Sequence, residues 1–124
     1  MRLLSLDVGG KRTGVAYYDD ATDIVLPLDT ITHPSDEMLI EHVRALCSER
    51  NIDRVIVGLP LLPSGKEGAQ SRATRAVADR LQATGIDVLL LDERYTTEAL
   101  DNPDAAAACT LLRTYIERKD RGRS

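Results

Sequence analysis

The chain has 124 residues, of which 43% are hydrophobic, and this size and composition suit one domain with a modest core rather than a disordered chain. The formal net charge of −4 argues against nucleic-acid binding through bulk positive charge, but it is compatible with a local basic patch. No apolar run approaches the ~20 residues of a membrane span, and the N-terminus lacks the pattern of a signal peptide, so we expect a cytoplasmic protein.

The first part of the chain predicts an antiparallel meander of three strands. Apolar stretches are separated by short polar turns, and the first turn carries paired glycines, which relieve the need for negative φ. The expected strands are residues 2–8, 13–18 and 24–31, with the tight turn at 9–12.

A helix follows the meander. Ser35 is a suitable N-cap, Asp36 and Glu37 would complement the helix dipole in the first turn, and apolar residues then recur at helical spacing as far as about Asn51. The other conspicuous residues of this region, His33 and Cys47, are expected to be structural. Cys47 and the distant Cys109 have no metal-ligand spacing and should be reduced.

Two buried strands and two further helices complete the order of elements. The β-branched or leucine-rich stretches 53–61 and 86–93 predict the strands. The helix between them follows a loop at 62–70 and ends at Gly85, a suitable C-cap residue. Asn102 and Pro103 predict the start of the last helix, as N-cap and first helical residue.

The resulting order, βββαβαβα, predicts an α/β fold with a mixed five-stranded sheet and helices on both faces, because a strand–helix–strand step favours a parallel, right-handed crossover. The same order of elements is typical of the ribonuclease-H-like fold. We expect a single domain over residues 1–117 and a basic, frayed tail over residues 118–124.

Carboxylates from distant parts of the sequence are expected at the edge of the sheet where the parallel strands end, which is where open α/β sheets bind ligands. Such a cluster favours a hard divalent cation, Mg²⁺ or Mn²⁺, and two such ions could support hydrolysis of a phosphodiester. Simpler interpretations give these acids no catalytic role and treat them as a turn residue, a charge at a helix end and a run of surface ion pairs. The acids are Asp7, Asp92, Glu93 and Asp104.

Cations flank the same edge and are candidates for holding phosphates. Lys11 and Arg12 follow the glycine pair, and Arg94 follows the last strand. Lys66 and Arg72 are further candidates for nucleic-acid binding, with a solvated helix face as the simpler interpretation.

Four stretches together resemble the YqgF/RuvX family, a branch of the ribonuclease-H-like nucleases. They are "LDVGGKRTGVA", "IVGLPL" with "GKEG" downstream, "DERYTT", and "DAAAACTLLRTY", and they extend from Leu3 to Tyr115. The resemblance implies a metal-dependent nuclease in which Asp7, Glu93 and Asp104 bind the metal, with Asp92 as a secondary candidate. The family is linked to maturation of the 5′ end of the 16S ribosomal RNA precursor and has also been labelled as Holliday junction resolvases.

The chain departs from the family pattern before the last helix. Only "EALDN" separates Thr97 from Pro103, where family members usually carry a longer and often basic segment. This shorter segment removes a candidate lid over the site, and the difference affects how the substrate would be bound.

Four functions compete at this point. The leading hypothesis is a nuclease acting on structured or single-stranded RNA in ribosome biogenesis, as a monomer or homodimer. A resolvase of DNA junctions would use the same chemistry and should be dimeric, because a junction has two-fold symmetry. "DVGGKRTGVA" also resembles the phosphate-binding start of actin/hexokinase-type ATPases, which need two such halves. A non-catalytic RNA-binding module is the last alternative, although the chain offers few aromatic residues for base stacking.

Overall fold

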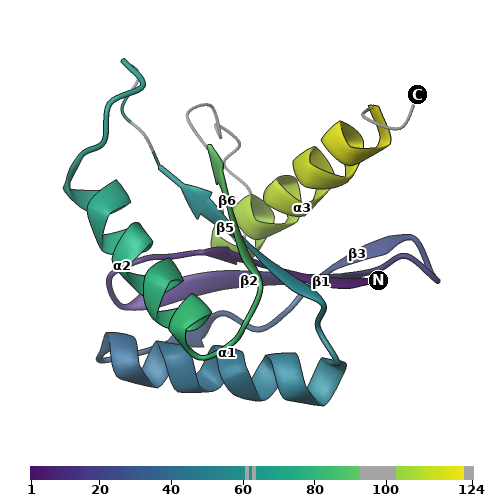
Figure 1. Cartoon of the computed structure of the whole chain (residues 1–124), viewed down its shortest axis with the longest axis horizontal. Coiled ribbons are helices and arrows are strands. Elements are labelled where there is room, and N and C mark those ends of the chain that lie inside the picture. Colours follow the sequence, from purple (N-terminus) through teal and green to yellow (C-terminus); the bar gives the residue numbers. More distant parts are fainter. Residues whose placement is uncertain (61, 63, 93–102, 122–124) are drawn as a thin grey trace.

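The computed structural model describes residues 1–60, 62, 64–92 and 103–121 (Figure 1). Within these residues the strands form one mixed sheet in the order β3-β2-β1-β5-β6, and a short strand β4 pairs with β2. The strands are Arg2–Asp7 (β1), Arg12–Asp19 (β2), Ile24–Pro27 (β3), Ile31–Thr32 (β4), Arg54–Leu59 (β5) and Val88–Asp92 (β6). The helices are Asp36–Arg50 (α1), Ala69–Ala83 (α2) and Pro103–Arg121 (α3).

The pairing confirms both the meander and the parallel crossovers. Strands β1, β2 and β3 pair antiparallel, whereas β1 pairs parallel with β5 and β5 parallel with β6. In this register Leu6 lies beside Val57 and Leu59 beside Asp92. The carboxyl ends of β1, β5 and β6 therefore meet at one edge of the sheet, as the sequence predicts.

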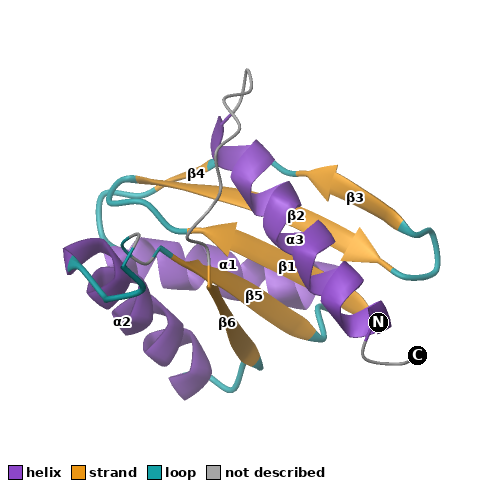
Figure 2. Ribbon diagram, turned by 90° about the horizontal axis from the view of Figure 1, so that it is seen from above, coloured by secondary structure: helices purple, strands orange, loops and turns teal. Residues whose placement is uncertain are grey.

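Helices cover both faces of the sheet (Figure 2), which confirms the expected layering. Leu4 and Leu6 of β1 pack into the core under α1 and α2, while Leu3, the alternate residue, packs into the core under α3. This alternation assigns every residue of β1 to one of the two faces. None of the helices in the described part of the chain is long and apolar enough to cross a membrane.

The predicted ends of α1 and the predicted end of α2 are confirmed, whereas the loop predicted over residues 62–70 is too long, because α2 already begins at Ala69. The Ser35 side chain accepts a hydrogen bond from the Met38 amide, and Asn51 caps α1 in the left-handed conformation with φ of 53°. Gly85 follows α2 with φ of +95°. Helix α3 begins at Pro103 as expected, whereas its predicted N-cap, Asn102, lies outside the described residues.

Both cysteines are free thiols, as predicted. Cys109 is buried and Cys47 is partly buried, and burial raises the pKa of the Cys47 thiol to about 11. At neutral pH Cys47 is therefore a protonated, weakly reactive thiol that packs beside the core.

The single strand expected over residues 24–31 is wrong, because the structure divides it in two. Strand β3 ends at Pro27, whose ring nitrogen has no hydrogen to donate to a ladder. Strand β4 then pairs with the beginning of β2, where Thr13 lies opposite Ile31. The described part of the chain thus has six strands where the sequence predicted five.

The expected start of a frayed tail at residue 118 also differs from the structure. Helix α3 continues to Arg121, so residues 118–121 are helical. The Lys119 ammonium group lies 3.2 Å from the Met1 sulfur, which places this last part of α3 beside the start of β1.

The expectation that Gly9 and Gly10 provide positive φ is wrong, since neither residue has it. The two glycines differ instead in the space around them. A Cβ atom on Gly9 would collide with the carbonyl oxygen of Arg12, whereas a Cβ on Gly10 would meet nothing within 4 Å. Only Gly9 is therefore required by the close approach of the backbone in this turn.

This difference predicts that the substitution Gly9→Ala destabilises the fold by about 2 kcal/mol, because the turn must open to accommodate the new methyl group. The matched substitution Gly10→Ala should change the free energy of unfolding by less than ~0.5 kcal/mol. Urea denaturation of both variants measures the difference, and equal unfolding midpoints would contradict the assignment.

Candidate active site at the carboxyl edge of the sheet

Asp7 ends the central strand β1 and lies at the edge where the parallel strands terminate. Its neighbour on the same face, Ser5, is fully buried and donates a hydrogen bond of 2.6 Å from its hydroxyl to the Ala108 carbonyl oxygen of α3. Asp7 is partly buried and, by the alternation of the strand, lies on this α3 face. The carboxylate thus belongs to the side of the sheet that α3 covers.

Helix α3 runs antiparallel to β1, and the contacts give its register. The end of α3 lies beside Met1 through Lys119, and Ser5 contacts Ala108. Two strand residues advance about 6.6 Å and one helical turn about 5.4 Å, so Asp7 is displaced from the Ser5 contact toward the beginning of α3, the part of the helix that contains residue 104. The side chain of Asp104 is not among the side chains that the structure describes.

The buried alanines of α3 permit this close approach. Ala105 and Ala108 are 2% and 0% exposed, and the latter supplies the carbonyl that Ser5 contacts. The sequence prediction that the alanine run would let the last helix lie close to the sheet is confirmed by this hydrogen bond.

Asp92 lies at the same edge but on the opposite face of the sheet from Asp7. Val88 and Leu90 pack with the core under α1 and α2, whereas Leu91 packs with the core under α3. Alternation therefore assigns Asp92, which is exposed, to the α1/α2 face. The next two candidates in the sequence, Glu93 and Arg94, lie outside the described residues.

The predicted phosphate-binding cations Lys11 and Arg12 are exposed in the turn between β1 and β2, at the same edge as Asp7. Helix α2 restrains the beginning of this turn, because the Gln70 side-chain amide donates a 3.0 Å hydrogen bond to the Val8 carbonyl. Sequence reasoning placed Gln70 in a loop and assigned it no role. No pattern in the chain indicates this long-range contact.

His33 restrains the other end of the turn. Its backbone amide donates a 2.8 Å hydrogen bond to the Lys11 carbonyl, and its Nε2 atom is hydrogen-bonded at 2.8 Å to Thr13 Oγ1. His33 is buried, with only 1% of its surface exposed, which is compatible with the sequence interpretation of a structural residue. Its connection to the cationic turn was missed, because residue 33 is far from residues 11–13 along the chain.

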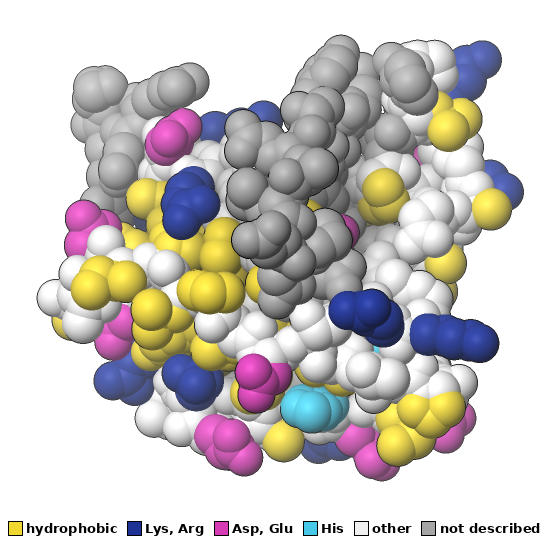
Figure 3. Space-filling model, turned by 180° about the vertical axis from the view of Figure 1, so that it is seen from behind, with side chains coloured by type: hydrophobic (Ala, Val, Ile, Leu, Met, Phe, Trp, Pro, Cys, Tyr) yellow, Lys and Arg dark blue, Asp and Glu magenta, His cyan; other side chains and the backbone are white. Residues whose placement is uncertain are grey.

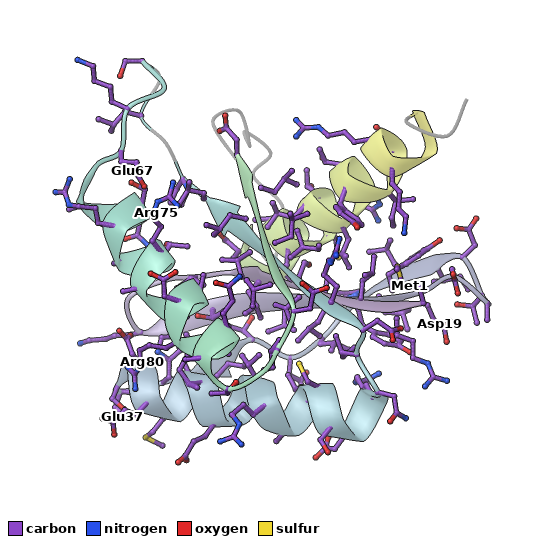
Figure 4. The ribbon with its side chains drawn as sticks, in the orientation of Figure 1. Met1, Asp19, Glu37, Glu67, Arg75 and Arg80 are labelled. Carbon is purple, nitrogen blue, oxygen red and sulfur yellow. The ribbon has the colours of Figure 1, made fainter. Side chains whose placement is uncertain are left out.

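Lys66 and Arg72 are exposed near the start of α2, as a nucleic-acid contact requires. Arg75, on the same helix, is engaged in an ion pair with Glu67 (Figure 4). On the face drawn in Figure 3, Lys and Arg side chains are interspersed with Asp and Glu. Among the described residues of that face no continuous basic surface is visible, so individual cations of this set rather than a broad field would contact a polyanion.

The described side chains do not by themselves make a metal site. Among them, no three His, Cys, Asp or Glu residues lie close enough together to hold an ion. Two of the four predicted acids, Glu93 and Asp104, fall outside this set. The described part of the predicted cluster therefore consists of Asp7 on one face and Asp92 on the other.

The architecture is the ribonuclease-H-like fold that the order of elements predicts. A solved structure titled "T. thermophilus RuvC in complex with Holliday junction substrate" superposes with a TM-score of 0.69 over 98% of this chain and 97% of that chain, at 12% identity. The family model described as "RuvX: Holliday junction resolvase" matches residues 1–118. The chain belongs to the RuvX family.

Curated relatives agree with this membership. A protein from Anaeromyxobacter sp. (strain Fw109-5), named "Putative pre-16S rRNA nuclease", is 35% identical over 133 aligned positions that cover 94% of this chain and 97% of the relative. A relative of the same name from Chloroflexus aurantiacus is 35% identical over 94% of this chain and 87% of its own length. Because 133 positions exceed the 124 residues of this chain, the alignment with the first relative contains residues that this chain lacks.

The contact between Ser5 and Ala108 predicts a stability effect. The substitution Ser5→Ala should lower the free energy of unfolding by about 1 kcal/mol, because it removes a buried hydrogen bond while the Ala108 carbonyl keeps its partner within the helix. The matched substitution Ser48→Ala, at an exposed position of α1, should have no such cost. Urea denaturation compares the two, and an equal cost for both would show that the contact does not hold α3.

Proposed function

We propose that this protein is a metal-dependent nuclease that hydrolyses phosphodiester bonds at the carboxyl edge of its sheet. The observation that carries the proposal is the position of Asp7. It ends the central strand and, by alternation from Ser5, lies on the face covered by α3, two residues beyond the contact between Ser5 and Ala108. Family membership and the fold are consistent with this chemistry.

The metal-binding set proposed is Asp7, Glu93 and Asp104. Carboxylate oxygens are the ligands that Mg²⁺ and Mn²⁺ prefer, so the donor chemistry fits a hard divalent ion. Asp92 fits this set poorly, since its position on β6 belongs to the face opposite Asp7. Of the adjacent pair, we therefore assign the ligand to Glu93.

A bound ion would activate a water molecule and stabilise charge on the leaving oxygen. The cations of the chain would orient the substrate. Lys11 and Arg12 lie at the same edge as Asp7 and would bind phosphates on either side of the scissile bond. Lys66, Arg72 and Arg94 are proposed as further contacts to the polyanion.

The substrate proposed is RNA, with maturation of the 5′ end of the 16S ribosomal RNA precursor in the cytoplasm as the biological reaction. The names of the curated relatives support this assignment. The description of the family model supports a second candidate, the resolution of Holliday junctions. Junction resolution would require a dimer, because both strands are cut symmetrically.

The central prediction concerns Asp7. The substitution Asp7→Asn should reduce metal-dependent cleavage of precursor or single-stranded RNA by about 100-fold or more, since it removes the charge of a direct ligand where even outer-shell changes cost 10–100-fold. Cleavage is measured with Mg²⁺ and with Mn²⁺, on RNA, single-stranded DNA and a four-way junction in parallel.

The matched control is Asp79→Asn, which makes the same change of charge at an exposed position of α2 and should leave the rate unchanged. Full activity of Asp7→Asn would refute the metal site. Preferential cleavage of the junction by a dimer would favour the resolvase over the RNA nuclease.

A further inference from the structure

The turn that carries Lys11 and Arg12 depends on pairing along its outer side. Strand β3 pairs with β2 only from Ala16 onward, so the beginning of β2 would lack an outer neighbour without β4. Strand β4 supplies that neighbour by placing Thr32 opposite Arg12, and the residue that follows it, His33, continues the contact.

His33 holds the turn on both sides of Arg12. Its backbone amide bonds to the carbonyl of Lys11, and its imidazole bonds to the hydroxyl of Thr13, both at 2.8 Å. These partners immediately precede and follow Arg12 in the chain. The backbone of Arg12 is further confined by the close approach of Gly9 to its carbonyl.

The buried polar pair of His33 and Thr13 is not explained by its contribution to the stability of the fold alone. Both side chains are fully or almost fully buried, and no residue in the described part of the chain offers a hydrogen-bond partner to the buried Nδ1 atom of His33. An unsatisfied buried polar atom is costly, and replacing both members of a polar pair by apolar groups of similar shape is often neutral or stabilising. The pair therefore contributes to the geometry of the turn rather than to stability alone.

We propose that His33 is a positioning residue that, through Thr13 and the Lys11 carbonyl, fixes the backbone from which the side chains of Lys11 and Arg12 extend toward substrate phosphates. The inference rests on the proposed function, because it assumes that these cations contact a nucleic-acid backbone. In an acidic protein the affinity for a polyanion depends on a few cations, and fixing them in advance reduces the entropy lost on binding.

The test is a binding experiment without catalysis. Fluorescence anisotropy of labelled single-stranded RNA in EDTA compares the wild type with the double variant Thr13→Val/His33→Leu, which replaces the polar pair by apolar side chains. We expect about fivefold weaker binding, corresponding to the loss of one hydrogen bond's constraint, and an unfolding midpoint in urea no lower than that of the wild type. The single variant His33→Gln, whose side-chain amide can replace Nε2 as the partner of Thr13, should retain an affinity within about twofold of the wild type.

A double-mutant cycle identifies the residue through which His33 acts. Arg12→Ala should weaken binding in the wild type but add little to the double variant, whereas Arg72→Ala should have the same effect in both backgrounds. The slope of the logarithm of the binding constant against the logarithm of the salt concentration should fall in magnitude by about 0.7 in the double variant. This is the contribution of one phosphate contact on a single strand. The matched control is His42→Leu, at an exposed position of α1, which should leave binding unchanged.

Each other result has a definite meaning. Unchanged binding by the double variant, additivity with Arg12→Ala, or a loss of binding that accompanies a lower unfolding midpoint would overturn the positioning role while leaving the nuclease proposal intact. Absence of RNA binding by the wild type, together with absence of cleavage, would overturn the proposed RNA nuclease and this inference with it.

Discussion

The hydrogen bond between Ser5 and the Ala108 carbonyl determines how α3 lies on the sheet, and the geometry of the candidate site follows from it. A fully buried hydroxyl must find an acceptor, and in this position the nearest one is a carbonyl of the helix backbone. Only small side chains on α3 allow that approach. The bond holds Ser5 against Ala108, and Asp7, two residues beyond Ser5 on the same face, lies in the direction of the beginning of α3.

The opposite face supplies a second constraint, which acts on the cations rather than on the acids. The turn after Asp7 is closed by backbone contact at Gly9, by Gln70 from α2, and by His33 from the segment before α1. Helix α2 and the segment that precedes α1 are thus hydrogen-bonded to the cationic turn. The carboxylate lies on the face covered by α3, whereas these restraints on the turn come from α2 and from residue 33.

The sequence predicts most of the fold because its local signals agree with one another. Ser35, Asn51 and Gly85 mark helix ends by chemistry that acts within a few residues, and the apolar stretches of β5 and β6 are too β-branched or too leucine-rich to remain exposed. The division of residues 24–31 into two strands was not predictable in this way. It depends on which part of β2 is left unpaired by β3 on its outer side, and this is a property of the assembled sheet.

The same contrast between local signals and long-range pairing applies to the candidate site. Asp7 could be proposed from the sequence because a carboxylate at the end of a central parallel strand is informative without knowledge of its neighbours. The proposal of Glu93 rather than Asp92 rests on the alternation of β6 between two cores, which the sequence left open. His33 illustrates the remaining limit, since a lone buried histidine is usually structural. Only the three-dimensional pairing of residue 33 with residues 11 and 13 connects this histidine to the two cations that we propose it positions.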